Sequence, residues 1–290
     1  MEAGLVVNPV AGGRAFRSID RLEELLRKKV SLKTLVTRSR GDAESFAREL
    51  SGKDTIIVAG GDGTINEVIN GLLISDNTES LKKPFIVIIP LGTANVLANE
   101  LSIPKKIEDA VHLALTGFPR NVSLGRINGR HFSLMAGIGF DGETVLGVSS
   151  SIKRLSGKGA YILSGIINLL SYNPPIINIK TDRTNISGTT AVIGNTHFYA
   201  GRFHVTTEAG ISEPFLDLCL FKGKRRKDML KYIFGVISER HLNYKDVYYE
   251  KCSHLDISSI GTVHIQVDGD YFCTLPVKID VVPDALNIIC

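Results

Sequence analysis

The sequence has few of the features that mark disulfide scaffolds or metal clusters. Its four cysteines form no C-x-x-C pair and have no histidine nearby at metal-ligand spacing; they are Cys219, Cys252, Cys273 and Cys290. We interpret them as reduced residues of strands or core. The seven histidines form no H-x-x-x-H pair and no Cys-His cluster, so we assign them no metal.

Long apolar runs and a strong net charge are also missing. The most membrane-like stretch, residues 160–170, has about half of the ~20 residues that cross a bilayer. Residues 4–7 read as a short strand followed at once by Asn8 and Pro9, which is unlike a secretory signal, so we expect a cytoplasmic protein. A net charge of +4 is too small to require nucleic acid, and we expect no such partner.

What is present is an ordinary globular composition in a chain long enough for two domains, with 290 residues, 43% of them hydrophobic and 22% charged. The first third alternates β-branched runs with segments of helical periodicity. The predicted strands are residues 5–7, 32–36, 55–59 and 85–89, and the predicted helices are 16–28, 42–50, 65–73, 94–101 and 107–116. Strands apolar on both faces that alternate with helices predict a parallel sheet covered on two sides.

From about Pro119 the pattern changes to short alternating runs separated by turn pairs. Asn128-Gly129, between runs 122–127 and 130–135, predicts a tight hairpin. Further strands are predicted at 176–181, 189–193, 216–221, 263–267 and 277–282, and helices at 159–170 and 227–240. We therefore expect an α/β nucleotide-binding domain over residues 1–119, a mainly antiparallel β domain over 120–282, and a cleft between them.

Three predicted strands end in loops suited to binding anions. The first loop runs from Asn8 to Arg14, with Gly12 and Gly13 for close backbone approach. The second, Gly60-Gly61-Asp62-Gly63-Thr64, opens a helix whose free N–H groups point outward. The third, Pro90-Leu91-Gly92-Thr93-Ala94-Asn95, repeats that arrangement, with Thr93 as the expected helix N-cap.

Each loop alone also fits an ordinary tight turn, and it is the presence of three that favours phosphate binding. The Gly60–Thr64 loop matches neither the G-x-G-x-x-G dinucleotide fingerprint nor the G-x-x-x-x-G-K-[ST] P-loop. Those two common nucleotide-binding interpretations therefore lose their motif support. In an open parallel sheet such loops emerge at the carboxyl ends of the strands, where ligands bind.

These motifs resemble the diacylglycerol kinase catalytic family, which includes sphingosine kinases and bacterial lipid kinases. The resemblance rests on the three loops, on Asn66-Glu67-Val68 after the second, and on later segments through most of the chain. Those segments are Gly137-Ile138-Gly139-Phe140-Asp141, Gly194-Asn195, Ala200-Gly201, Glu213-Pro214-Phe215-Leu216-Asp217 and Val267-Asp268-Gly269-Asp270.

The resemblance implies a kinase that binds ATP between an α/β domain and a β-sandwich, with residues 283–290 returning to the first domain. By analogy, nucleotide contacts fall on Asn8, Pro9, Val10, Ala11, Gly12, Thr37, Gly60, Gly61, Asp62, Gly63, Thr64, Ile65, Asn66 and Thr93. A structural Mg²⁺ would bind the side chain of Glu213 and the carbonyls of Gly210 and Phe215. Asp270 would activate the lipid hydroxyl.

The chain departs from the family pattern at three of these places. Val96 stands where relatives usually carry Asp, Glu213-Pro214 where they more often carry Asp-Gly, and Asp270 where they usually carry Glu. The resemblance still implies an ATP-dependent kinase of a lipid hydroxyl, diacylglycerol or a related lipid, acting at a membrane surface.

Several residues keep two interpretations. A carboxylate beside the acceptor hydroxyl is chemically expected in such a kinase, but Asp268-Gly269-Asp270 also reads as a simple hairpin turn. If Asp270 is not the base, Asp268 is the next candidate. Asp62 either holds a Mg²⁺-bound water at the phosphates or bonds its own loop, and Asp141 is structural or catalytic.

Two other functions remain open from the sequence. An NAD kinase shares the Gly-Gly-Asp-Gly-Thr loop, although not the residues that follow it here, and a nucleotide-binding regulatory protein could have lost catalysis. The basic run Lys222–Lys227 is either a solvated face or a site of contact with anionic lipid. We assign no oligomeric state.

Overall fold

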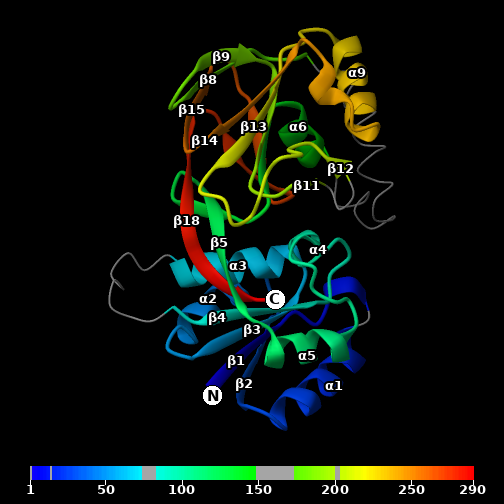
Figure 1. Ribbon diagram of the computed structural model, residues 1–290, viewed down its shortest axis with the longest axis vertical. Coiled ribbons are helices and arrows are strands. Elements are labelled where there is room, and N and C mark those ends of the chain that lie inside the picture. The colour runs from blue at the N-terminus through cyan, green and yellow to red at the C-terminus, as the bar shows by residue number, and fades with distance from the viewer. Residues whose placement is uncertain (1, 14, 74–82, 148–172, 200–202) are drawn as a thin grey trace. The chain divides into compact units, whose positions relative to one another are not determined.

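The computed structural model describes residues 2–13, 15–73, 83–147, 173–199 and 203–290. The chain forms two compact units, and each has its own core (Figure 1). The first unit comprises Met1–Ser123 with Pro283–Cys290, and the second comprises Leu124–Val282. Within the described ranges, no helix is both long enough and apolar enough to cross a bilayer.

The first unit is built on a parallel sheet, as predicted. Its strands lie in the order β2 (Ser31–Val36), β1 (Glu2–Val7), β3 (Thr55–Gly60) and β4 (Phe85–Pro90). Asn287 and Ile288, near the end of β18 (Val277–Ile289), continue the sheet in parallel on β4. Every residue of β3 is buried, which fits a strand that is apolar on both faces.

Helices cover both faces of this sheet. Figure 1 shows α2 (Asp42–Glu49) and α3 (Asp62–Leu73) on one side, and α1 (Ala15–Arg27) and α5 (Ile107–Thr116) on the other. The remaining helical segments are η1 (Ala11–Gly13) and α4 (Val96–Glu100). Gly71 lets α3 approach α2, because a Cβ there would lie 2.2 Å from the carbonyl oxygen of Glu44.

The second unit is a sandwich of two largely antiparallel sheets. One contains the part of β5 (Pro119–Ile127) from Leu124 on, the first part of β18, and β6 (Arg130–Phe132), β8 (Ile177–Thr181), β9 (Asn185–Gly188) and β15 (His254–Ser259). The other has the order β14 (Val247–Cys252), β13 (Leu216–Phe221), β10 (Thr190–Gly194), β7 (Met135–Ile138), β16 (His264–Val267) and β17 (Asp270–Thr274). Also described in this unit are β11 (Phe198–Tyr199), β12 (Phe203–His204), α6 (Phe140–Gly147), α9 (Arg226–Ile237) and η2 (His241–Asn243).

The core of the second unit lies between these two sheets. Ile179, Ile257 and Ile279 of one sheet pack in a single buried cluster with residues such as Ile193 and Leu218 of the other. The predicted fold class, a parallel α/β part followed by a mainly antiparallel β-sandwich, is therefore confirmed.

The Asn128-Gly129 hairpin is confirmed, with φ values of 45° and 86° at the two turn residues and Ile127 paired with Arg130. The predicted strand 130–135 is wrong as a single strand, because the chain leaves β6 after Phe132 and starts β7 at Met135. The predicted helix 227–240 corresponds to α9, which ends at Ile237. The predicted helix 159–170 lies outside the described residues.

Candidate active site

The three glycine-rich loops converge beyond the carboxyl ends of β1, β3 and β4. The N–H of Leu91 donates to the carbonyl of Gly60 over 2.9 Å. A Cβ on Gly92 would lie 2.5 Å from Cα of Gly61, and one on Gly12 would lie 2.2 Å from the carbonyl oxygen of Leu91. Gly12 also has a φ of 66°, which disfavours larger residues. The glycines therefore allow backbone to meet backbone where the loops touch.

Asn8 ties the first loop to the second. Its Nδ2 donates to Oγ1 of Thr64 over 3.0 Å, while its Oδ1 accepts the N–H of Val10 over 3.1 Å. Thr37 follows β2, is buried, and donates its backbone N–H to the carbonyl of Val7 over 2.8 Å. Thr37 is thus bonded to the residue that precedes the first loop.

Helix α3 begins at Asp62, so the second loop supplies the N-terminal turn of a helix, as predicted. Gly61 accepts the N–H of Ile65 over 3.1 Å, and Gly63 and Thr64 belong to the turn whose N–H groups have no intrahelical acceptor. Such a turn attracts anions through its N–H groups and the helix dipole. Farther along α3, Glu67 has a structural role, because its Oε1 accepts the N–H of Gly41 at the start of α2 over 3.0 Å.

The carboxylate of Asp62 binds the third loop. Its Oδ2 and Oδ1 accept the N–H groups of Val96 and Leu97, each over 3.1 Å, and so cap α4. Burial raises the pKa of Asp62, whereas these backbone hydrogen bonds oppose the rise. Asp62 therefore fastens the second loop to the third, a contact that neither interpretation from the sequence included.

The predicted N-cap at Thr93 is wrong. Thr93 is exposed, and α4 starts only at Val96 because Asn95 has a φ of 48°. The cap comes instead from Asp62. Asn95 donates from Nδ2 to the carbonyl of Gly92 over 2.8 Å, while its buried Oδ1 accepts no hydrogen bond from the described residues. An unused acceptor at this position fits a ligand that carries a hydrogen-bond donor or a hydrated cation.

In the second unit, Asp268 anchors the turn between β16 and β17. Asp268 and Gly269 have φ values of 49° and 88°, and Val267 pairs with Asp270. The two oxygens of Asp268 accept four hydrogen bonds of 2.9–3.1 Å, from Ser133 N, Ser133 Oγ, Leu134 N and Met135 N. These bonds engage the backbone of residues 133–135, where the chain passes from β6 in one sheet to β7 in the other, which explains the break in the predicted strand.

A buried polar chain holds the other side of the same turn. The carboxylate of Asp141 accepts the hydroxyl of Tyr199 and, over 2.7 Å, Nε2 of Gln266. Oε1 of Gln266 accepts the N–H of Gly269, also over 2.7 Å. Burial raises the pKa of Asp141, although both hydrogen bonds oppose that rise. The turn is thus fixed from two directions, and Asp270, the first residue of β17, is exposed.

The residues expected to hold a structural Mg²⁺ do not fit a divalent cation. The Glu213 carboxylate forms an ion pair with the Lys251 ammonium, which also donates to the carbonyl of Glu208 over 2.8 Å. The carbonyl of Gly210 accepts the N–H of Glu213 over 2.8 Å, and Phe215 immediately precedes β13. Mg²⁺ requires a shell of oxygen ligands, whereas here an ammonium group lies among the acidic oxygens.

Asp217 strengthens that conclusion. It is buried, its Oδ2 accepts the hydroxyl of Tyr249, and its Oδ1 lies 3.8 Å from Nζ of Lys251. Burial works against the charge of Lys251, but Glu213 and Asp217 leave its pKa raised. Among the residues that the structure describes, no group of three His, Cys, Asp or Glu side chains is arranged to hold a metal.

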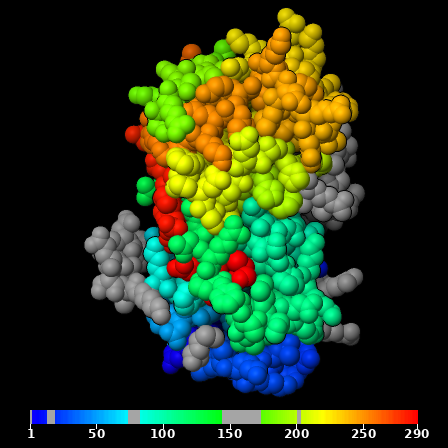
Figure 2. Space-filling model, viewed as in Figure 1, coloured from blue at the N-terminus to red at the C-terminus, as the bar shows by residue number. Residues whose placement is uncertain are grey.

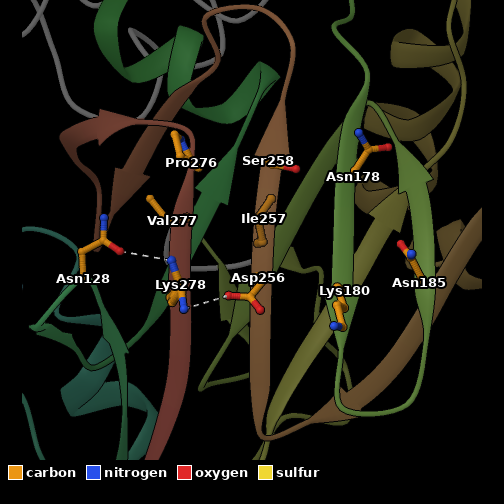
Figure 3. Close-up of a pocket in the computed structure, with 10 residues that line it drawn as sticks. All are labelled: Asn128, Asn178, Lys180, Asn185, Asp256, Ile257, Ser258, Pro276, Val277 and Lys278. Carbon is orange, nitrogen blue, oxygen red and sulfur yellow. Dashed lines mark hydrogen bonds and ion pairs between the residues drawn. The ribbon is translucent and has the colours of Figure 1, made fainter.

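A groove of about 580 Å³ lies on the outer face of one sheet of the second unit (Figure 3). Asn128 accepts the N–H of Lys278 over 3.1 Å at its edge, and Nζ of Lys278 lies 3.8 Å from Oδ1 of Asp256. Asn178, Lys180 and Asn185 line it from β8 and β9. None of the predicted site residues lines this groove.

Sequence reasoning missed Asn95, Tyr199, Gln266 and Lys251. Gln266 gave no signal, because the predicted strand 263–267 alternates Val263, Ile265 and Val267 with the polar His264 and Gln266, a pattern that predicts a solvent-facing Gln266. The structure buries it, and a buried polar residue indicates a specific hydrogen-bond partner. Lys251 gave no signal either, because it lies in a segment for which no strand was predicted.

Comparison with known proteins agrees with this architecture. Residues 2–127 match the family model described as diacylglycerol kinase catalytic domain, and residues 135–290 match the model described as YegS C-terminal NAD kinase beta sandwich-like domain. A protein of Staphylococcus carnosus (strain TM300) named diacylglycerol kinase is 31% identical over 283 residues, covering 94% of this chain and 90% of the relative. A Bacillus subtilis (strain 168) protein of the same name is 29% identical, covering 94% of this chain and 91% of the relative.

Solved structures show the same fold. The crystal structure of a diacylglycerol kinase from Bacillus anthracis str. Sterne has a TM-score of 0.76 at 22% identity, with 99% of this chain and 96% of that chain covered. Another structure from the same organism, with the same coverage, has a TM-score of 0.82 at 23% identity. With both family models matched in order and a relative 31% identical over 94% of this chain, the chain belongs to the diacylglycerol kinase catalytic domain family and is a lipid kinase.

Proposed function

We propose that this lipid kinase transfers the γ-phosphoryl group of ATP to the hydroxyl of diacylglycerol or a related lipid. The names of the relatives support this acceptor, since the curated proteins from Staphylococcus carnosus and Bacillus subtilis are both called diacylglycerol kinase. Phosphoryl transfer depends mainly on positioning and charge neutralisation, which backbone N–H groups and a cation supply.

The donor is proposed to be Mg·ATP bound by the three loops of the first unit. The N-terminal turn of α3 offers N–H groups to phosphate oxygens, and the touching glycines leave room for close backbone approach. The unused Oδ1 of Asn95 and the carboxylate of Asp62 lie on these loops as acceptors for the hydrated cation that accompanies ATP. The remaining proposed contacts are Asn8, Pro9, Val10, Ala11, Gly12, Thr37, Gly60, Gly61, Gly63, Thr64, Ile65, Asn66 and Thr93.

Asp270 is proposed as the general base. Its carboxylate takes the proton of the lipid hydroxyl as the hydroxyl oxygen bonds to the γ-phosphorus, and the bond to the bridging oxygen breaks to release ADP. The exposure of Asp270 on a turn held from both sides supports this role, since a base must be accessible and fixed. Asp268 is less suited, because its oxygens already accept four hydrogen bonds.

The single observation that carries the proposal is the convergence of three glycine-rich loops on the N-terminal turn of α3. The test is transfer of label from γ-labelled ATP to purified dioleoylglycerol, phosphatidylglycerol, a sphingoid base and a polyprenol, each presented alone, with NAD in a parallel reaction. Labelled phosphatidic acid is expected. Labelled NADP without labelled lipid would identify an NAD kinase, and nucleotide binding without any transfer would indicate a regulatory protein.

The proposed site of action is the cytoplasmic surface of a membrane. Diacylglycerol resides in the bilayer, so a kinase that phosphorylates it must meet the lipid there, and +4 net charge favours an anionic surface over a cationic one. No nucleic-acid partner is proposed.

A further inference from the structure

Helix α9 of the second unit uses one face for internal packing. Met229, Tyr232 and Gly235 are buried, and the ring of Tyr232 lies 4.7 Å from that of Phe221. The Tyr232 hydroxyl donates to Asp246 over 2.6 Å and accepts the N–H of Gly223 over 2.7 Å. These contacts fix which face of α9 points away from the sandwich.

The opposite face carries three large apolar side chains that nothing in the described structure covers. Leu230 is 44% exposed, Phe234 is 67% exposed and Ile237 is 56% exposed. Their spacings of four and three residues place them in one stripe along a helix. Figure 1 shows α9 on the outside of the second unit, and Figure 2 shows the yellow to orange atoms of this region at the molecular surface.

Basic residues enter the same face from its N-terminal end. Lys224, Arg225, Arg226 and Lys227 are all exposed, and Arg226 precedes Leu230 by one helical turn. Two nearby carboxylates have partners: Asp228 accepts the backbone N–H of Arg225 over 3.0 Å, and Asp246 pairs with Lys231. The outward face of α9 therefore combines apolar side chains with positive charge.

We propose that this α9 face, Leu230, Phe234 and Ile237 with the basic residues 224–227, docks the enzyme on an anionic lipid bilayer. Helices that lie in a bilayer interface have this composition, with aromatic and aliphatic residues below and Lys or Arg at the headgroups. A stable protein interface usually needs about 20–30 residues from each partner, far more than this stripe offers. The inference rests on the proposed function only for the reason why the enzyme would dock, because vesicle binding is measured without turnover.

The absence of tryptophan from the chain provides a direct probe. Phe234→Trp would be the only tryptophan, and its fluorescence should shift to shorter wavelength with vesicles of phosphatidylglycerol mixed into phosphatidylcholine, without ATP. Phe118→Trp is the matched control, since Phe118 is an 80% exposed phenylalanine of the first unit. No shift at position 234, or an equal shift at position 118, would overturn the proposal.

Substitutions then separate the two components of the surface. The triple variant Leu230→Ser, Phe234→Ser and Ile237→Ser should weaken vesicle binding at least tenfold. Replacing the four basic residues 224–227 by Gln should abolish the salt dependence of vesicle binding. The control Ile260→Ser, at another exposed apolar residue, should change neither the binding nor its salt dependence. Phosphorylation of a dispersed short-chain diacylglycerol should be unaffected by the triple serine variant, which shows that it folds. Unchanged vesicle binding by that variant would overturn docking and leave the face to a protein partner. If wild-type protein bound the vesicles but phosphorylated no lipid, that result would overturn the proposed function and not the docking.

Discussion

Asp268 and Asp270 lie two residues apart in one hairpin, but their surroundings differ. Asp268 accepts four hydrogen bonds from the segment Ser133 to Met135, whereas Asp270 is exposed at the start of β17. Substituting each residue by asparagine should therefore have opposite consequences for catalysis and for stability.

We predict that Asp270→Asn lowers kcat by about 10² or more, because a positioned base typically contributes 10² to 10⁴ in rate. ATP affinity and the melting temperature should be unchanged, and Asp270→Glu should retain activity, since it keeps a carboxylate. Asp268→Asn should instead lower the free energy of unfolding by about 1–3 kcal/mol, because one of the two oxygens that accept hydrogen bonds from residues 133–135 becomes an NH₂ group, which cannot accept them. Full turnover by Asp270→Asn would place the base elsewhere.

Asp62 joins two of the loops, so its removal affects both binding and structure. Asp62→Ala leaves the N–H groups of Val96 and Leu97 without their acceptor and should cost about 1–2 kcal/mol of stability as well as nearly all turnover. Asp62→Asn retains one acceptor oxygen and should be closer to wild type in stability but still impaired in turnover. Thermal melting and steady-state kinetics on both variants test this, and near-normal turnover by either one removes Asp62 from the reaction.

Lys251 supplies the positive charge at the place where relatives are expected to hold a metal. We predict that EDTA leaves the melting temperature of the nucleotide-free protein unchanged, although it stops turnover by removing Mg·ATP. Lys251→Met should lower the free energy of unfolding by about 1–2 kcal/mol, since Glu213 and the buried Asp217 lose their counter-charge. Lys245→Met, at an exposed lysine, is the control. A fall in melting temperature with EDTA, abolished by Glu213→Gln, would restore the metal site.

At the scale of elements, the β16–β17 turn depends on Gln266. Gln266→Leu keeps the volume but leaves Asp141 with one donor fewer and the N–H of Gly269 without its acceptor. We predict a several-fold lower kcat with little change in the KM for ATP, because the turn that carries Asp270 loosens while the three glycine-rich loops of the first unit are untouched. An unchanged kcat in a correctly folded variant would show that the polar chain is structural only.

The elements also show what a sequence can predict. Strands such as β13 and helices such as α5 were predicted with the bounds observed, because apolar periodicity reports which face is buried. The loops at Gly60 and Gly92 were recognisable because each contains glycine directly after a predicted strand, and it was their occurrence together with the first loop that distinguished them from ordinary tight turns. These signals are local.

The contacts that complete the candidate site are not local. Asp62 caps a helix 34 residues later, Asp268 binds backbone 133–135 residues earlier, and Gln266 binds Asp141 across 125 residues. A carboxylate in a turn has the same local sequence pattern whether it faces solvent or another strand, so only the fold identifies its partners. The predicted N-cap at Thr93 was wrong for this reason, because the side chain of Asp62, distant in sequence, caps α4 instead.

At the scale of the molecule, the two units contribute different parts of the proposed reaction. The first provides glycine-rich loops and a helix N-terminus for the phosphates, and the second provides the turn with Asp270 and the outward face of α9. A lipid kinase needs all three functions, namely a donor site, a base and access to the bilayer. The resemblance implies the donor loops and Asp270, and the sequence already offered the basic run Lys222–Lys227 as one candidate for lipid contact, whereas the apolar stripe of α9 emerges only from the structure.

We propose that this lipid kinase uses ATP to phosphorylate a lipid hydroxyl. The most direct test is transfer of label from γ-labelled ATP to dioleoylglycerol in mixed vesicles containing phosphatidylglycerol, with wild type and Asp270→Asn compared at equal ATP occupancy. We expect labelled phosphatidic acid from wild type and a rate at least about 10²-fold lower from the variant. Absence of any labelled lipid from folded, ATP-binding wild-type protein across the panel of acceptors would contradict it.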